Sequence, residues 1–386
     1  MPKIILHCDM DRFYPAVEEK YDPVLKKIPF AVCGDPAMRH GIVMSASSLA
    51  RRYGVRAGLR FSEARKLCPN LMYVTADMPK YLQEAKAARE VYLKYAESIV
   101  PYGIDESWII LDEGTSWQEA GQIADLVQLE IMYSMELSVS VGISYNLIFA
   151  KLGSDYLKPN GITVITRENF REMVWPLDVG KLLFVGEVRK KLLLGAGIRT
   201  IGDIAGSEPE FLSRIIKSKA GYELWQYANG DDRNFKPTSD KIESIGNTLT
   251  PPADLRTNEE TSAALYMLAS AVSVRLRKHS LKTKCIGIVM KDSEFNKTTR
   301  QCTSVYATDS ECRIYDRAYG LFRAHYEWKN PLRSIGIRTT NFDVCRQLML
   351  CDEPESGIMD LEVSERVRRL GNRFGKIRIE NAPGLD

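Results

Sequence analysis

Short apolar runs alternate with amphipathic helical stretches in the first part of the chain. Residues 3–8 form an apolar run that ends at Asp9, which predicts a buried strand delivering a carboxylate at its end. Apolar positions recur at helical spacing in residues 80–100, and a second helix is predicted near 117–135. Residues 102–111 predict a turn followed by a strand, and residues 138–143 predict a third strand. Strands separated by helices indicate an α/β layer with a central sheet.

The later part of the chain has a different pattern. From about 166 to 235 it predicts short helices broken by glycine, among them a helix, a tight turn and a helix at 184–204. Residues 229–241 are polar and rich in turn formers, which is typical of a linker. Two strands and two helices are predicted after it, at 285–290, 332–337, 262–279 and 309–326.

Length and charge narrow the class of protein. The chain has 386 residues, of which 45% are hydrophobic and 27% charged, so it is globular and long enough for about two to four domains. Its 53 basic and 50 acidic residues leave a net charge of +3, which does not indicate a bulk polyanion binder. The excess of positive charge lies in one late segment, because residues 241–343 hold 16 basic and 11 acidic side chains. An ordinary solvated face and a surface for a nucleic-acid backbone both fit it.

Cysteine and histidine contribute little. The eight cysteines form no C-x-x-C pair, so a zinc site has little support; with no secretory signal, we expect reduced thiols in a cytoplasmic protein. The four histidines are scattered, which gives a histidine-based triad no local support. No apolar run approaches the roughly 20 residues of a membrane span, so no membrane partner is expected.

Two pairs of carboxylates stand at the ends of predicted apolar strands: Asp9 with Asp11, and Asp105 with Glu106. Neighbouring acids repel each other unless a positive charge compensates. Mg²⁺ suits such a site, because it prefers hard oxygen ligands and binds carboxylates together with phosphate oxygens. Two such ions about 4 Å apart serve phosphoryl and nucleotidyl transfer. On spacing alone the pattern is weak, since such acids also occur as caps and turn residues.

Four segments together carry a more specific signal. In order and approximate spacing they resemble the motifs of the Y-family DNA polymerases, the lesion-bypass enzymes: DMDRFYPAVE at 9–18, ARRYGV at 50–55, YGIDES at 102–107, and VGISYN at 141–146 with Ala150, Lys151 and KPNG at 158–161. The resemblance covers nearly the whole chain and is weakest in 240–386. It implies a DNA-directed DNA polymerase, a nucleotidyltransferase of translesion synthesis and DNA repair with low fidelity.

The resemblance also implies an α+β multidomain fold, the right-hand polymerase with palm, fingers, thumb and little finger domains. The expected boundaries are a palm at 1–165 with fingers inserted at about 20–75, a thumb at 166–232, a linker at 233–240, a little finger at 241–343 and a C-terminal tail at 344–386.

The family's metal site carries over to the acidic motifs. Asp9, Asp105 and Glu106 would be the catalytic acids and would hold two Mg²⁺ ions, for which Mn²⁺ could substitute, with the Met10 carbonyl as a further ligand. The primer 3′-hydroxyl would attack the α-phosphate of a deoxynucleoside triphosphate and release pyrophosphate. For Asp11 a structural cap is the favoured role.

The nucleotide would meet both the fingers and the palm. Arg51 and Lys158 would neutralise its triphosphate, with surface charges as the alternative. Phe13 and Tyr14 would also belong to the nucleotide-binding set. Tyr14, next to Phe13 in the core, would lie under the sugar and exclude a 2′-hydroxyl, with a core aromatic as the alternative. Small residues would cover the nascent base pair loosely and so tolerate damaged templates: Ser45, Ala46 and Ser47.

The chain departs from the family's pattern at several positions. Ser48 stands where the family commonly has a tyrosine, which would shorten a contact to the triphosphate. Leu147 replaces a common lysine, Trp108 follows Ser107 in place of a more usual small-aromatic pair, and Phe184 stands where the thumb hairpin usually has its first glycine. These changes bear on rate and nucleotide affinity more than on reaction type.

Primer–template DNA is the expected macromolecular partner. The hairpin glycine Gly186 would grip a DNA phosphate through backbone N–H groups, with a plain helical turn as the alternative. The little finger would contact the backbone through its basic side chains: Arg275, Arg277, Lys278, Lys282, Lys284, Arg333 and Arg338.

The tail resembles a short clamp-binding peptide at Gln347, Leu348 and Leu350, which would add a sliding clamp to the partners. Cys351 replaces the usual aromatic, and a small covering strand is the alternative. Residues 366–375 are similar to the tails of Gram-positive members. Because one chain carries every motif, a monomer is expected.

Two other functions stay open on sequence grounds. The departures at Ser48, Leu147 and Phe184 also fit a catalytically weak DNA-binding scaffold with the same fold. A palm-like nucleotide cyclase is a third reading, which the thumb-like hairpin and the basic late segment disfavour.

Overall fold

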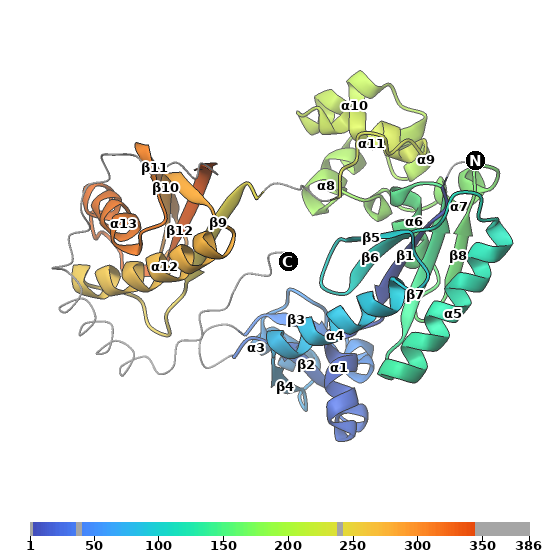
Figure 1. Cartoon of the computed structure of the whole chain (residues 1–386), viewed down its shortest axis with the longest axis horizontal. Helices are drawn as coiled ribbons and strands as arrows, with labels where there is room; N and C mark the ends of the chain where they lie inside the picture. The colour runs from blue at the N-terminus through green and yellow to red at the C-terminus, as the bar shows by residue number, and fades with distance from the viewer. Residues whose placement is uncertain (1–2, 36–40, 238–241, 344–386) are drawn as a thin grey trace. The chain divides into compact units, whose positions relative to one another are not determined.

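The structure, a computed structural model, describes residues 3–35, 41–237 and 242–343. They form two compact units, one of residues 3–34 with 41–237 and the other of residues 242–343 (Figure 1). No helix in the described ranges is long and apolar enough to cross a membrane. None of the six cysteines in those ranges forms a disulfide.

The palm is built on a five-stranded sheet in the order β5-β6-β1-β7-β8. Neighbours are antiparallel except for the parallel pair β7 and β8. The strands are β1 (Ile5–Met10), β5 (Ser98–Pro101), β6 (Glu106–Ile110), β7 (Val139–Ser144) and β8 (Ile162–Ile165). The sequence predicted a strand that delivers Asp9 at its end. Because β1 pairs with a neighbour on both sides, it continues through Asp9 to Met10.

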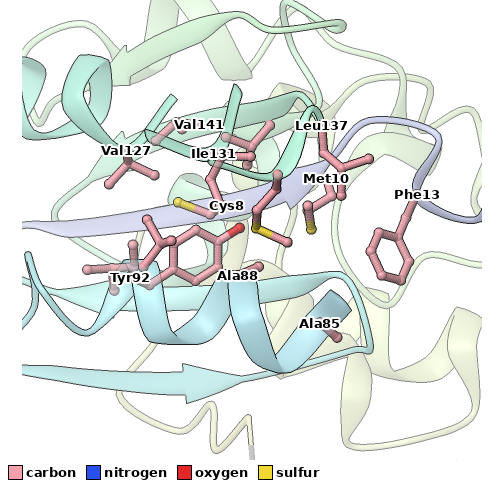
Figure 2. Close-up of a cluster of buried hydrophobic side chains, with 14 of the residues drawn as sticks. Cys8, Met10, Phe13, Ala85, Ala88, Tyr92, Val127, Ile131, Leu137 and Val141 are labelled. Carbon is pink, nitrogen blue, oxygen red and sulfur yellow. The ribbon is translucent and has the colours of Figure 1, made fainter. Parts of the chain in front are cut away.

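The alternation of side chains along β1 separates core from site. Leu6, Cys8 and Met10 face the main hydrophobic core, against α1 (Phe13–Tyr21), α4 (Met78–Tyr92) and α5 (Trp117–Met135). Figure 2 shows Cys8 and Met10 among the side chains of α4 and α5. His7 and Asp9 therefore project to the opposite face. The predicted helix at 117–135 matches α5, whereas α4 ends at Tyr92, short of the predicted 100.

Helix α6 (Leu147–Ser154) lies on that opposite face, very close to the sheet. A Cβ atom on Gly142 of β7 would lie 2.0 Å from the Ala150 carbonyl oxygen, so only glycine allows this approach. The approach brings Lys151 and Ser154 of α6 within reach of β6 and β1.

The fingers form a three-stranded sheet in the order β3-β2-β4 with a small core of its own. The strands are β2 (Phe30–Cys33), β3 (Val43–Ala46) and β4 (Met72–Thr75), accompanied by the helices η1 (Pro23–Lys27), α2 (Ser48–Arg52) and α3 (Phe61–Leu67). Strands of four residues are too short to show a period clearly, and the sequence pattern did not predict them.

The thumb consists of short helices, as the sequence predicted: α7 (Phe170–Val174), η3 (Val179–Lys181), α8 (Glu187–Gly195), α9 (Ile201–Ala205), α10 (Pro209–Ile216) and α11 (Ala220–Ala228). The predicted helix-turn-helix is α8, a turn through Gly197 at φ 85°, and α9. Trp108 of the palm contacts Phe235 with ring centroids 5.6 Å apart, so the start of the predicted linker is packed.

Phe184 adopts a backbone conformation that glycine favours. Its φ is 70°, in the left-handed region that costs a side-chain-bearing residue about 1 kcal/mol. Its ring packs against Phe235 and Tyr227, with centroids 5.5 and 5.9 Å away. Aromatic pairs of this kind contribute about as much as the strain costs, so the packing of the ring offsets the cost of this backbone conformation.

The second unit is a four-stranded antiparallel sheet in the order β11-β10-β12-β9. Its strands are β9 (Ser244–Leu249), β10 (Lys282–Asp292), β11 (Lys297–Thr308) and β12 (Leu332–Asp343). Helices α12 (Asn258–Lys278) and α13 (Glu311–His325) bury one face of the sheet, in a core with Ile288 and Ile337. The edge strand β11 is mostly exposed and polar, which explains why the sequence did not predict it.

Candidate active site

One pocket gathers most of the predicted site residues of the first unit. Its volume is about 520 Å³, and it lies where β1, β6, the start of α1, the fingers and the loop after α6 meet. It is lined by Asp9, Met10, Asp11, Arg12, Phe13, Tyr14, Met44, Ser45, Ser48, Arg51, Asp105, Glu106, Asp155, Lys158 and Pro159.

Strand register places the acids side by side. Asp9 of β1 is the direct partner of Glu106 of β6, and Asp105 precedes Glu106. The Met10 amide donates to the Asp105 carbonyl at 3.1 Å, which ties the two acidic segments together. The sequence predicted that the three acids converge, and they line the same pocket.

Burial works against the charge of two of these acids. It raises the pKa of Asp9 to about 7, although Lys158 pulls that pKa down; Glu106 and Asp105 raise it further. Burial followed by the charge of Glu106 raises the pKa of Asp105 to about 6. Two carboxyls therefore titrate near neutral pH, as expected where acids crowd without enough positive charge.

Lysines compensate the other charges. Lys158 pairs with Asp9 at 2.7 Å and with Asp155 at 3.0 Å. Lys151 of α6 pairs with Glu106. Burial alone would raise the pKa of Glu106, but hydrogen bonding from His7 and the charge of Lys151 lower it to about 2. Because burial lowers the pKa of His7 to about 4, Lys151 is the partner that is charged at neutral pH.

Two residues beside the acids were not predicted from the sequence. His7 is fully buried, with Nδ1 2.8 Å from the Ser154 hydroxyl and Nε2 3.5 Å from a Glu106 oxygen. Lys151 was noted only as part of a motif. The alternation along β1 places His7 on the same face as Asp9, two residues away, and this was the available signal.

Asp11 serves the fold, as favoured from the sequence. It is buried, and it accepts hydrogen bonds from the Ser140 hydroxyl and from the Asn160 amide, each at 2.8 Å. It thereby fastens the loop that carries Lys158 to the end of β1.

The ring of Tyr14 packs against two other aromatic rings. Its ring meets Tyr81 of α4 edge-on, with centroids 4.8 Å apart, and Phe13 at 5.6 Å. The Tyr81 hydroxyl donates to Glu18 at 2.5 Å, and Lys80 pairs with the same carboxylate at 2.6 Å. Phe13 is buried in the palm core, as expected.

The fingers contribute Arg51, Ser45 and Ser48 to the pocket wall. Arg51 donates Nε to the Ala46 carbonyl at 3.0 Å and Nη2 to the Ser45 hydroxyl at 3.3 Å. Ala46 and Ser47, which we expected to cover the nascent base pair together with Ser45, are not among the residues that line the pocket. Ala46 is buried in the fingers core, and the Ser47 hydroxyl caps α2 by accepting from the Ala50 amide at 3.2 Å. The half-exposed Met44 lines the pocket instead, and sequence reasoning missed it.

The hard oxygen donors suit Mg²⁺. Within the ranges that the structure describes, no three His, Cys, Asp or Glu side chains surround one point closely enough to hold an ion. In this structure the carboxylate of Asp9 is engaged by Lys158. The oxygen donors fit a divalent ion, which would compete with Lys158 for Asp9 and with Lys151 for Glu106.

None of the predicted DNA-binding residues is among those that line this pocket. Gly186 is exposed at the first turn of α8. In the second unit, Arg275 donates to the Gly246 carbonyl at 2.9 Å and Arg277 lies 3.9 Å from Asp309, at the end of α12 with the exposed Lys278.

The other basic side chains of that unit lie on its strands. Lys282 is exposed, Lys284 pairs with Asp343 at 3.0 Å, and the Arg333 guanidinium lies 4.7 Å from the Phe295 ring centre. Arg338 is exposed and alternates with the core residue Ile337, so it points away from the face that α12 covers. Within the second unit, the predicted DNA contacts thus come from both the end of α12 and the strands of the sheet. Gln347, Leu348 and Leu350 lie outside the described residues.

Comparisons with known proteins agree with the motifs. Residues 8–155 match the impB/mucB/samB family, and residues 242–350 match the C-terminal domain of that family. The chain is 39% identical over 383 residues to DNA polymerase IV of Acetivibrio thermocellus, covering 97% of this chain and 96% of that protein. It is 30% identical over 381 residues to DNA polymerase IV 1 of Bacillus subtilis, covering 97% and 91%.

Solved structures show the same fold. A chimera of the Y-family DNA polymerases Dbh and Dpo4 superposes with a TM-score of 0.77 at 23% identity, covering 89% of this chain and all of that one. A Dbh ternary complex gives 0.61 at 24% identity, covering 88% and 99%. The architecture is therefore the right-hand fold of palm, fingers, thumb and little finger, and the chain belongs to the Y-family DNA polymerases.

Proposed function

We propose that this DNA polymerase extends primers across damaged templates by a two-metal mechanism centred on Asp9, Asp105 and Glu106. The single observation that carries the proposal is the pocket in which these three acids face basic side chains from the fingers and the palm. The primer 3′-hydroxyl loses its proton to solvent, and its oxygen forms a bond to the α-phosphorus of a deoxynucleoside triphosphate. The bond to the bridging oxygen breaks, and pyrophosphate leaves.

The metal roles are assigned to the oxygen donors of the acidic motifs. Asp9, Asp105, Glu106 and the Met10 carbonyl are proposed to hold two Mg²⁺ ions, with Mn²⁺ as a substitute. When bound, such ions make the attacking hydroxyl a better nucleophile and offset negative charge on the phosphates. Lys151 keeps Glu106 ionised, which is the form that binds a cation.

The nucleotide roles follow from where charge and aromatic surface meet. Arg51 and Lys158 are proposed to bind the triphosphate, with Ser45 and Ser48 beside them. Lys158 would exchange its contact with Asp9 for a phosphate oxygen. Tyr14 is proposed to lie under the deoxyribose as a steric gate next to Phe13, and the contact with Tyr81 supports a fixed ring position.

Low fidelity is part of the proposal. The fingers contain only short strands and helices, which supports a lightly covered nascent base pair. Met44, Ser45 and Ser48 form the fingers side of the pocket, and none of them is a large rigid ring. A wall of this kind holds a distorted template base with little steric penalty.

The DNA and its partners are assigned more coarsely. We propose that Gly186 in the thumb and the basic side chains of the second unit bind the primer–template backbone. Of these, Lys282 and Arg338 have the most accessible charges, whereas Arg275 is engaged with a backbone carbonyl. Clamp binding through Gln347, Leu348 and Leu350, a monomeric state and a cytoplasmic location stay predictions.

Primer extension tests the proposed function directly. The purified chain should extend a primer opposite an undamaged template and opposite an abasic site when Mg²⁺ or Mn²⁺ is supplied, and chelation of the metal should stop both. Binding of primer–template without any extension would favour the scaffold. Conversion of nucleoside triphosphate without DNA would favour a cyclase.

The metal requirement should depend on pH in a definite direction. Because the pKa of Asp9 is raised to about 7 and that of Asp105 to about 6, protons compete with the cation below neutral pH. The Mg²⁺ concentration that gives half-maximal extension should therefore fall by about tenfold or more between pH 6 and pH 8. Primer–template affinity in EDTA, measured at the same pH values, is the control. An unchanged Mg²⁺ requirement would contradict the assignment of these acids as ligands.

A further inference from the structure

The nucleotide pocket contains a third cation besides Arg51 and Lys158. Arg12 stands between the acidic motif at the end of β1 and helix α1, and it lines the same pocket. Its backbone is left-handed, with φ 50° and ψ 41°, a conformation that costs a non-glycine residue about 1 kcal/mol. Backbone strain of this kind clusters at active sites and ligand-binding sites.

The guanidinium of Arg12 has few partners. It donates one hydrogen bond, from Nη1 to Glu19 at 3.3 Å, and 27% of its side chain is exposed. A guanidinium carries five N–H donors, so most of its hydrogen-bonding capacity is available to a ligand.

Arg51 lines the same pocket as Arg12, and fewer carboxylates offset its charge. Its hydrogen bonds go to the Ala46 carbonyl and the Ser45 hydroxyl, and among the described residues it forms no ion pair with a carboxylate. Burial lowers its pKa first, and the charges of Arg12 and then Arg56 lower it further. Two cations held close together are unfavourable unless an anion lies between them. Lys158, in contrast, has two carboxylate partners.

We propose that Arg12 is a third triphosphate-binding residue, which contacts the phosphates from the palm side opposite Arg51. The inference rests on the proposed function and extends it to a residue outside the predicted set. A guanidinium can donate two parallel hydrogen bonds to phosphate oxygens. On the fingers side, Ser48 offers only a short hydroxyl, so Arg12 supplies donor capacity that this wall lacks.

Nucleotide titrations of primer extension test this role. Arg12→Ala should raise KM for the deoxynucleoside triphosphate about tenfold with kcat within about twofold, as expected when a charge-assisted hydrogen bond to the ground state is lost. Arg12→Lys should recover part of the loss. Arg52→Ala, which removes an exposed charge from the neighbouring α2 outside the pocket, is the matched control and should leave KM unchanged.

Binding without turnover separates this inference from the proposed function. The probe is an α,β-imido deoxynucleoside triphosphate, titrated calorimetrically onto the protein with primer–template and Mg²⁺. Its Kd should weaken about tenfold in Arg12→Ala, whereas inhibition of extension by the deoxynucleoside monophosphate should be unaffected. Equal losses in Arg12→Ala and Arg52→Ala, or an unchanged Kd in Arg12→Ala, would overturn the role. A wild-type chain that binds the probe but does not extend a primer would instead refute the proposed reaction.

Discussion

Replacing Asp105 by Asn and Glu106 by Gln together should lower the rate of primer extension by about 10³-fold or more, because it removes the charge that holds the catalytic metals. The substituted side chains keep nearly the same volume, so packing around β6 should be preserved. Primer–template affinity, measured by fluorescence anisotropy, should stay within about twofold of wild type. Extension is measured under single-turnover conditions at saturating nucleotide.

The far end of the same strand offers a matched control. Asp112 and Glu113 are exposed and follow β6 after the single residue Leu111. Changing them to Asn and Gln removes the same two charges from the same hairpin without touching the pocket, and extension should be unaffected. Near-normal extension by the Asp105 and Glu106 double variant would show that the site is wrongly assigned. Equal loss in both double variants would point to net charge.

Folding of the variant should not confuse this comparison. Burial raises the pKa of Asp105, which means that its charge destabilises the folded metal-free protein at neutral pH. The Asp105→Asn change removes that cost. The Glu106→Gln change leaves Lys151 without its carboxylate partner, which destabilises the fold. Because the two effects oppose each other, the melting temperature of the double variant should change little.

The strongly patterned elements were predictable from sequence, and the residues that carry the chemistry largely were too. The apolar run before Asp9 and the spacing over 117–135 correspond to β1 and α5. Asp9, Asp105 and Glu106 lie in one pocket because β1 and β6 are adjacent in register, which the family motifs anticipated and composition did not.

Other features depend on contacts that no local pattern encodes. The close approach at Gly142, which brings Lys151 to Glu106, requires knowledge of which strand α6 crosses. Ala46 and Ser47 appeared to be pocket residues because they are small, but their side chains serve the fingers core and the cap of α2. Met44 lines the pocket although its side chain is large. On β3, which side chain is exposed depends on the face of the sheet to which it points and not on its size.

Phe184 shows how a departure from a motif can be structurally silent. Glycine at a positive φ normally signals a turn that other residues avoid. Here the ring gains contacts with Phe235 and Tyr227 that offset the backbone cost. The sequence could identify the exception, but only the packing around it explains why the hairpin keeps its conformation.

Truncating Tyr14 to alanine should reduce discrimination against ribonucleotides by about 10²-fold or more, which corresponds to about 3 kcal/mol. The proposed gate acts by collision, so its strength depends on how firmly the ring is held. Tyr81 packs edge-on against the Tyr14 ring, and its hydroxyl donates a hydrogen bond to Glu18. The Tyr14 ring therefore cannot move away from the sugar without disturbing the buried pair of Tyr81 and Glu18. The measurement is the ratio of kcat/KM for a deoxynucleotide to that for the matching ribonucleotide.

Tyr14→Phe separates the ring from its hydroxyl and is the matched control for the gate. The phenylalanine ring fills the same space against Tyr81, so sugar discrimination should stay within a few-fold of wild type. Tyr81→Phe keeps the second ring but breaks its hydrogen bond to Glu18, which should loosen the brace and lower discrimination less than Tyr14→Ala does. If Tyr14→Ala leaves the ratio unchanged, the ring does not contact the sugar. If Tyr14→Phe loses as much as Tyr14→Ala, discrimination depends on the hydroxyl, and a purely steric gate is excluded.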